Sequence, residues 1–168
     1  APDLAYRAFL ALSAQYAHAL RDAGLRPGDR LALQLDKSPA MLALIASAIQ
    51  AGVVFLPLNS AYTPSEVGYF VGDAGAQLVV VDGTLLATLA PVAKAAGARL
   101  MGLNADGSGS FADLARALPE SFPTEPRAPG DLAALLYTSG TTGRSKGAML
   151  SHDNLLSNAR ILTEVLRF

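Results

Sequence analysis

Residues 137–147 carry the strongest chemical signal in the sequence, with the order Tyr-Thr-Ser-Gly-Thr-Thr-Gly-Arg-Ser-Lys-Gly. Exposed backbone N–H groups, hydroxyls and a lysine cation are the groups that bind a polyphosphate. Gly140, Gly143 and Gly147 allow positive φ and close approach of the backbone at little steric cost. The segment follows the apolar run 132–136, which predicts a buried strand, and it precedes a second apolar stretch. We interpret it as a nucleotide phosphate loop between two strands.

A better-known phosphate motif fails on spacing. The Walker A pattern needs a glycine, four residues and then Gly-Lys-Ser/Thr, whereas Lys146 follows Ser145 and precedes Gly147. This spacing argues against a P-loop NTPase or a kinase. A surface hairpin remains the structural alternative, because turns also favour glycine, serine and threonine. The order of strand, hydroxyl and glycine segment, lysine and strand favours phosphate binding over that alternative.

Other polar residues have simpler explanations. Gly107, Gly109 and Ala112 match a dinucleotide-binding spacing, but Gly107 comes only at the fourth residue after the predicted strand and no long helix follows. His152 follows Ser151, the expected N-cap of a helix, and is most simply a solvated histidine of the first turn.

The remaining charged and imidazole groups form no recognisable centre. His18 and His152 lack the spacing of a metal site. Arg26, Asp29 and Arg30 are most simply a charged turn, and no Ser-His-Asp arrangement can be identified.

Helices and strands alternate along most of the chain, which predicts how the loop is positioned. Apolar residues at helical spacing and capping signals, including a capping box at Thr63 and Glu66, predict helices over 4–23, 38–51, 64 to about 74, 84–95 and 111–118. Largely apolar runs predict strands over 30–35, 53–58, 78–81 and 99–103. The continuous apolar run 53–58 is the pattern expected in a parallel sheet buried on both faces. The fold class is therefore α/β, with a mostly parallel sheet and flanking helices. Residues 119–130 contain four prolines and are predicted to form an extended linker.

Composition excludes several classes of protein. The 168 residues are half apolar and 16% charged with a net charge of −1, so neither disorder nor a basic nucleic-acid surface is expected. The absence of cysteine excludes disulfides and thiolate metal sites and is typical of a cytoplasmic protein. The uncharged stretch 40–58 is interrupted at 50–52 and at Pro57, so it is too short to span a membrane. No secretory signal is recognised.

Residues 137–147 closely resemble the phosphate-loop signature of the adenylate-forming superfamily, which includes acyl-CoA synthetases, luciferases and peptide-synthetase adenylation domains. Residues 49–59, with the order Ile-Gln-Ala-Gly-Val-Val-Phe-Leu-Pro-Leu-Asn, resemble its upstream "AGxxxxPLN" stretch. Residues 4–30 resemble its N-terminal helix and turn. Within the superfamily, residues 61–63 and 143–154 look most like bacterial malonyl-CoA synthetases.

The resemblance implies an ATP-dependent ligase that joins a small carboxylic acid, with malonate favoured, to coenzyme A through an acyl-adenylate. It also implies which residues hold ATP and which one contacts Mg²⁺. The ATP-binding residues would be Thr138, Ser139, Gly140, Thr141, Thr142, Gly143 and Lys146, and Thr138 would contact Mg²⁺ as well. No catalytic residue is implied within these 168 residues.

Members of the superfamily run to several hundred residues, so residues 1–168 are expected to be the N-terminal part of an AMP-binding domain. The groups for adenine, ribose and the acyl chain would lie past Phe168, which makes the rest of the polypeptide a partner. One departure is Ser145, where the family usually has proline, so a slightly looser loop is expected. The alternatives are a medium- or long-chain fatty acyl-CoA synthetase, a non-catalytic nucleotide-binding module, and a structural domain whose loop is only a hairpin.

Overall fold

Parallel strands linked by helices form the sheet that carries the loop. The computed structural model describes residues 5–138 and 145–166. Within these residues one six-stranded sheet has the order β4-β3-β1-β2-β5-β6. The strands are β1 (Arg30–Gln34), β2 (Val54–Pro57), β3 (Leu78–Val81), β4 (Arg99–Gly102), β5 (Leu132–Thr138) and β6 (Lys146–Ser151). Neighbouring strands from β4 to β5 pair in parallel, and β6 pairs antiparallel with β5, which confirms the predicted mostly parallel α/β class.

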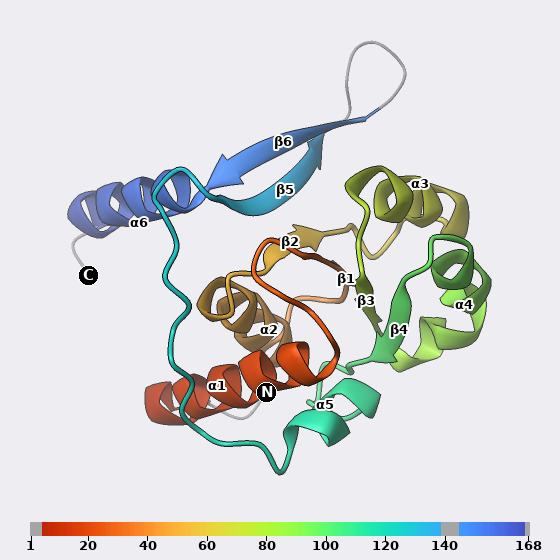
Figure 1. Cartoon of the computed structure of the whole chain (residues 1–168), viewed down its shortest axis with the longest axis horizontal. Coiled ribbons are helices and arrows are strands. Elements are labelled where there is room, and N and C mark those ends of the chain that lie inside the picture. The colour runs from red at the N-terminus through yellow and green to blue at the C-terminus, as the bar shows by residue number, and fades with distance from the viewer. Residues whose placement is uncertain (1–4, 139–144, 167–168) are drawn as a thin grey trace.

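Helices cover both faces of the parallel strands (Figure 1). The helices are α1 (Tyr6–Asp22), α2 (Pro39–Gln50), α3 (Pro64–Ala74), the short 3-10 turn η1 (Gly83–Leu85), α4 (Leu86–Ala95), α5 (Ser110–Ala115) and α6 (His152–Leu166). Strand side chains alternate between two buried clusters. Leu31 and Leu33 pack in the cluster that includes α1, α2 and α5, whereas Ala32 and Val79 pack in the cluster that includes α3 and α4. The central strands β1, β2 and β3 are therefore largely buried on both sides, as the parallel class predicts.

Local hydrogen bonds explain where two of the helices begin. Ser38 Oγ accepts from the Met41 N–H at 3.1 Å, with Pro39 as the first helical residue of α2. Thr63 and Glu66 form the predicted capping box at the start of α3. The helix ends at Gly75, whose left-handed backbone (φ 60°) suits glycine. The sequence predicted the starts of both α2 and α3 correctly.

Several element boundaries differ from the prediction. The helix expected over 84–95 begins with the 3-10 turn η1, and α5 ends at Ala115 rather than at 118. β5 extends to Thr138 and β6 begins at Lys146, so both ends of the expected loop belong to strands. Cross-strand pairing between β5 and β6 overrides the turn preference of the glycine and hydroxyl residues at these positions.

The linker 119–130 runs along the molecule outside the sheet, from α5 past α1 to the start of β5 (Figure 1). Glu125 donates its N–H to the Gln50 carbonyl at 2.8 Å and pairs with Arg21 at 2.7 Å. His18 Nε2 lies 2.9 Å from the Ser121 carbonyl, and its ring packs edge-on against Phe122. The predicted extended linker is therefore tied to α1 and to the end of α2.

The hairpin of β5 and β6 leads into α6, which lies beside it at the edge of the molecule (Figure 1). No residue of α6 is buried, and Ile161 and Val165 are among its exposed apolar side chains. Among the described residues, no helix has the length and apolar character needed to cross a membrane.

Candidate functional site: the hairpin at the carboxyl edge of the sheet

The carboxyl ends of the parallel strands share one edge of the sheet. β5 runs parallel to β2, so Thr138 leaves the sheet at the same edge as Gln34 and Pro57. Open α/β sheets bind ligands at this edge, especially where successive helices change face. The helix after β1 and the helix after β2 lie on opposite faces here. A cleft of about 530 Å³ lies between these two strand ends and is lined by Leu35, Asp36, Lys37, Met41, Leu58, Asn59 and Ser60.

Thr138 and Lys146 are direct cross-strand partners at the end of the hairpin nearest residues 139–144. Side chains of directly opposite residues leave the same face of an antiparallel pair with their Cβ atoms close together. Both residues are exposed. The fold thus brings a hydroxyl and a cation from the two strands to one surface, as a phosphate site needs.

The other predicted ATP-binding residues lie outside the described residues. They are Ser139, Gly140, Thr141, Thr142 and Gly143.

Gly147 is expected from the sequence to allow a positive backbone φ angle, and the structure gives it a different role. It is absent from the described glycines with positive φ. Gly147 lies opposite Tyr137, and a Cβ at Gly147 would come within 3.3 Å of Tyr137 Cζ. Glycine suits this position because a Cβ would be in tight contact with the tyrosine ring.

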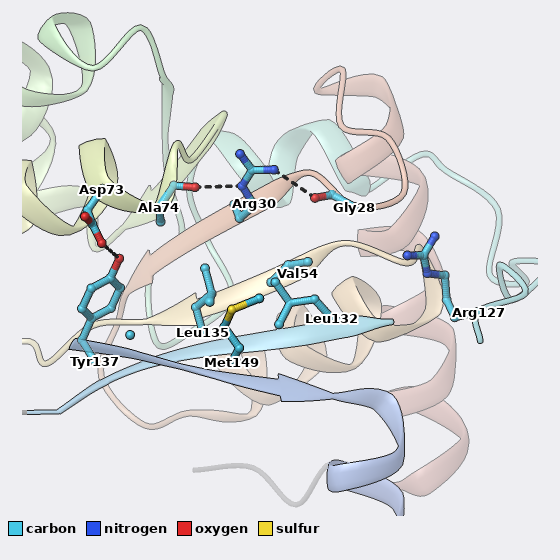
Figure 2. A pocket seen from close by; sticks show the side chains of 11 residues that line it. Gly28, Arg30, Val54, Asp73, Ala74, Arg127, Leu132, Leu135, Tyr137 and Met149 are labelled. Atoms are coloured by element: carbon cyan, nitrogen blue, oxygen red, sulfur yellow. Dashed lines mark hydrogen bonds between the residues drawn. The ribbon is translucent and has the colours of Figure 1, made fainter. Parts of the chain in front are cut away.

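Tyr137 and α3 enclose a second cleft beside the hairpin (Figure 2). The cleft has a volume of about 350 Å³, and its walls include Asp73, Leu135, Tyr137 and Met149. The Tyr137 hydroxyl donates to Asp73 Oδ2, and the Tyr69 hydroxyl donates to the Ser145 carbonyl at 3.2 Å. Sequence reasoning missed Asp73 and Tyr69, since they lie 64 and 76 residues before their partners Tyr137 and Ser145.

A family model described as "AMP-binding enzyme" matches residues 2–167 of the chain. The chain belongs to the AMP-binding enzyme family. This confirms the resemblance to adenylate-forming enzymes that the sequence motifs suggested.

Solved structures and curated relatives agree with this membership. MatB from Rhodopseudomonas palustris has a TM-score of 0.93 in its apo form, with 46% identity over 98% of this chain and 32% of that chain. Its ATP-bound form has a TM-score of 0.92, with 47% identity over 97% of this chain and 32% of that chain.

Two curated relatives differ in what their names describe. Feruloyl-CoA synthase from Amycolatopsis sp is 39% identical over 145 residues, which are 86% of this chain and 28% of that protein. Tyrocidine synthase 2 from Brevibacillus parabrevis is 33% identical over 138 residues, 82% of this chain and 4% of that protein. The chain thus spans about a third or less of the length of these relatives.

In this AMP-binding chain, the expected charged turn has a further structural role (Figure 2). Asp29 Oδ2 accepts from the Arg26 N–H at 2.8 Å, as a turn predicts. Arg30 instead reaches the end of α3, where its Nε donates to the Ala74 carbonyl at 2.8 Å and its Nη1 to the Gly28 carbonyl at 3.3 Å. The arginine therefore donates a hydrogen bond to a carbonyl at the C-terminal end of α3. Its positive charge also interacts favourably with the negative end of the helix dipole.

His152 is partly buried rather than fully solvated as predicted. The backbone N–H of His152 donates to the Asp131 carbonyl at 3.0 Å. The Asp131 carboxylate forms an ion pair with Arg127 at 3.1 Å. Burial lowers the pKa of the His152 imidazole, and the nearby Arg127 charge lowers it further, while Asp131 opposes both effects. His152 thus joins the end of the linker to the start of α6 and lies away from the Thr138 and Lys146 pair.

Two further motifs have structural explanations. Gly109 precedes α5, which has six residues, so the helix that a dinucleotide motif requires is too short. Within residues 5–138 and 145–166, no three histidine, cysteine or acidic side chains gather as a metal site would require.

Proposed function

We propose that the polypeptide containing this chain is an ATP-dependent carboxylate–CoA ligase, and that residues 137–147 hold the phosphates of ATP. The supporting observation is the pairing of Thr138 with Lys146 at the carboxyl edge of the sheet. Family membership adds the nucleotide, since the matching model describes AMP-binding enzymes.

The proposed reaction has two half-reactions. In the first, an oxygen of the carboxylate attacks the α-phosphorus of ATP. The bond between the α-phosphorus and the oxygen that bridges it to the β-phosphate breaks, and pyrophosphate leaves with that electron pair. The thiol of coenzyme A then attacks the acyl carbon, and AMP leaves as the thioester forms. Lys146 would offset the charge that develops on pyrophosphate in the first half-reaction.

The hydroxyls of Thr138, Ser139, Thr141 and Thr142 and the backbone of Gly140 and Gly143 would donate to the phosphate oxygens. Mg²⁺ would offset the charge of these oxygens, and the exposed Thr138 hydroxyl is the side-chain group that would contact it.

We also propose that the chain is the N-terminal part of an AMP-binding domain, with the linker at 119–130. The share of the relatives that it spans supports this division. Groups for adenine, ribose and the acyl chain would then lie elsewhere in the polypeptide. The proposed location is the cytoplasm, with which the absence of cysteine agrees.

Malonate is the proposed acid. Identity to MatB, a malonyl-CoA synthetase, is 46–47% and exceeds the 39% identity to feruloyl-CoA synthase. A medium- or long-chain fatty acid is the alternative substrate, and a non-catalytic nucleotide-binding module is the alternative function.

A panel of acids tests this assignment in the full polypeptide. The panel contains malonate, acetate, medium- and long-chain fatty acids, ferulate and amino acids, and the readouts are ATP–pyrophosphate exchange and thioester formation. Malonate is expected to support the highest rate. A preference for a monoacid refutes the malonate assignment, and Mg-ATP binding without exchange for any acid favours the module.

Replacement of Lys146 by alanine tests the site itself. Loss of one charge-stabilising donor is expected to slow exchange by roughly 10- to 1000-fold. Lys94→Ala is the matched control, because Lys94 is an exposed lysine on α4. Exchange at the wild-type rate in Lys146→Ala contradicts the proposed role.

A further inference from the structure

α3 contacts both strands of the hairpin, one on each side of residues 139–144. On β5, Tyr137 donates its hydroxyl proton to Asp73 Oδ2. Before β6, the Ser145 carbonyl accepts from the Tyr69 hydroxyl at 3.2 Å. These two bonds end one residue from Thr138 and one residue from Lys146, respectively.

Aromatic rings fill the space between α3 and the hairpin. The Phe70 ring is buried, and its centroid lies 4.7 Å from that of Tyr137 and 5.3 Å from that of Tyr69. The centroids of Tyr69 and Tyr137 are 6.4 Å apart, with the rings nearly perpendicular. Gly147 leaves room for the Tyr137 ring on the opposite strand. The hydrogen bonds are thus supported by packing on both strands.

On the β2 side, the register covers only the first part of β5. β5 is in register with β2 at Phe55 and Ala134, four residues before Thr138. Beyond that point β5 continues away from β2 (Figure 1), and the contacts with α3 supply its support.

The Tyr137 hydroxyl is a permanent donor. Burial raises the pKa of Tyr137 above its ordinary value, and the hydrogen bond to Asp73 and its negative charge raise it further. The acceptor is the exposed side chain of Asp73, and hydrogen bonds to a carboxylate are charge-assisted.

We propose that Tyr137, Asp73 and Tyr69 are positioning residues that fix the direction of Thr138 and Lys146 toward the phosphates of ATP. This proposal rests on the function proposed above. Misplacement of a catalytic group by about 1 Å can cost about a hundredfold in rate. Donors at the end of a hairpin therefore need a support such as α3.

The test separates the two half-reactions in the full polypeptide. Tyr137→Phe keeps the ring against Gly147 and removes the hydroxyl. It is expected to slow ATP–pyrophosphate exchange about tenfold at saturating ATP. Thioester formation from supplied acyl-adenylate and coenzyme A is expected to be unchanged, because pyrophosphate takes no part in it. A general loss of structure would slow both half-reactions.

A double-mutant cycle tests the pair directly. Asp73→Ala is expected to slow ATP–pyrophosphate exchange to a similar degree. The double variant, Tyr137→Phe with Asp73→Ala, is expected to be no slower than either single variant. Tyr69→Phe provides a second, independent variant. Tyr62→Phe is the matched control, because Tyr62 packs against Phe70 at 4.9 Å in the same cluster. Additive losses in the Tyr137 and Asp73 cycle overturn the proposed coupling.

Hydrogen exchange gives a readout that needs no activity. In Tyr137→Phe and Asp73→Ala, the amides of β5 and β6 are expected to exchange several-fold faster, while those of β1 and β3 remain unchanged. Wild-type exchange rates in both variants overturn the positioning role. If the wild-type polypeptide activates no acid, the proposed function fails, and the hydrogen-exchange comparison still decides whether α3 supports the hairpin.

Discussion

Tyr137 connects three parts of the structure through one side chain. Its ring lies against Gly147 on β6, its hydroxyl reaches Asp73 on α3, and its backbone continues into Thr138. The glycine at 147 is therefore explained by packing within the hairpin. The tyrosine that precedes the hydroxyl and glycine segment links that segment to the body of the protein.

Replacement of Gly147 by alanine tests this packing. The added Cβ would lie 3.3 Å from Tyr137 Cζ, and the bond to Asp73 restrains the ring from moving away. We expect Gly147→Ala to lower the free energy of unfolding by about 1 kcal/mol, the lower end of the cost of overpacking. The measurement is urea unfolding of the chain.

The matched control is Gly130→Ala, because a Cβ at Gly130 would meet nothing within 4 Å. The cost at 147 is expected to shrink in a Tyr137→Phe background, where the ring is free to shift. An equal cost in the two backgrounds contradicts the explanation.

At the scale of elements, α3 determines where the hairpin lies. The helix begins at the capping box of Thr63 and Glu66, and its last turn is bonded to Arg30. Tyr69 and Asp73 are four residues apart, which places them on one face of the helix. A helix with fixed ends can therefore present both side chains to the hairpin in a constant geometry.

Removal of the N-cap tests how firmly α3 is fixed. Thr63→Ala is expected to lower the free energy of unfolding by about 1 kcal/mol. Hydrogen bonds from the backbone and the hydroxyl of Thr63 hold the pKa of Glu66 below its ordinary value. A lowered carboxyl pKa contributes stability above the unfolded-state pKa, and this contribution is lost as pH falls through the folded-state value.

The difference between wild type and Thr63→Ala is therefore expected to be larger at neutral pH than at about pH 3. Thermal unfolding at the two pH values measures it, and Ser65→Ala serves as a control on the same turn. A difference that does not depend on pH would show that the capping box is unimportant in solution.

Local patterns predicted the elements well, because caps and apolar periodicity act over a few residues. The capping box and Ser38 placed two helices correctly, and largely apolar runs identified β1 to β4. The contacts at the site could not be predicted in the same way. Asp73 meets Tyr137 across 64 positions of sequence, and nothing local distinguishes it from any exposed aspartate. The strand character of Thr138 and Lys146 likewise depends on pairing across the hairpin, which outweighs the turn preference of their neighbours.

At the scale of the whole molecule, the body around β1 to β4 and the helix α6 differ in how many apolar side chains they bury. The body around β1 to β4 carries two apolar clusters with helices on both faces. The hairpin continues into α6, which has no buried residue and exposes Ile161, Val165 and Leu166 at 55–70%. Local stability is expected to follow this division, because buried contacts resist local opening.

Amide exchange of the chain measures the difference. The amides of α2, which buries Ala43 and Leu44, are expected to exchange at least about a hundredfold more slowly than those of α6. α3, with four buried residues, is expected to exchange at an intermediate to slow rate and serves as an internal reference. Equal protection of α2 and α6 contradicts the division.

The order of the strands has a consequence for biosynthesis. A ribosome delivers the N-terminal part first, and compact units can form as they emerge. β1 to β4 pair with one another through short crossovers, so they can assemble before β5 is made. During that interval β2 is an open edge of the sheet, and open edges invite pairing with other chains. The nascent polypeptide is therefore most exposed to aggregation after β4 is complete, until the linker has brought β5 alongside β2.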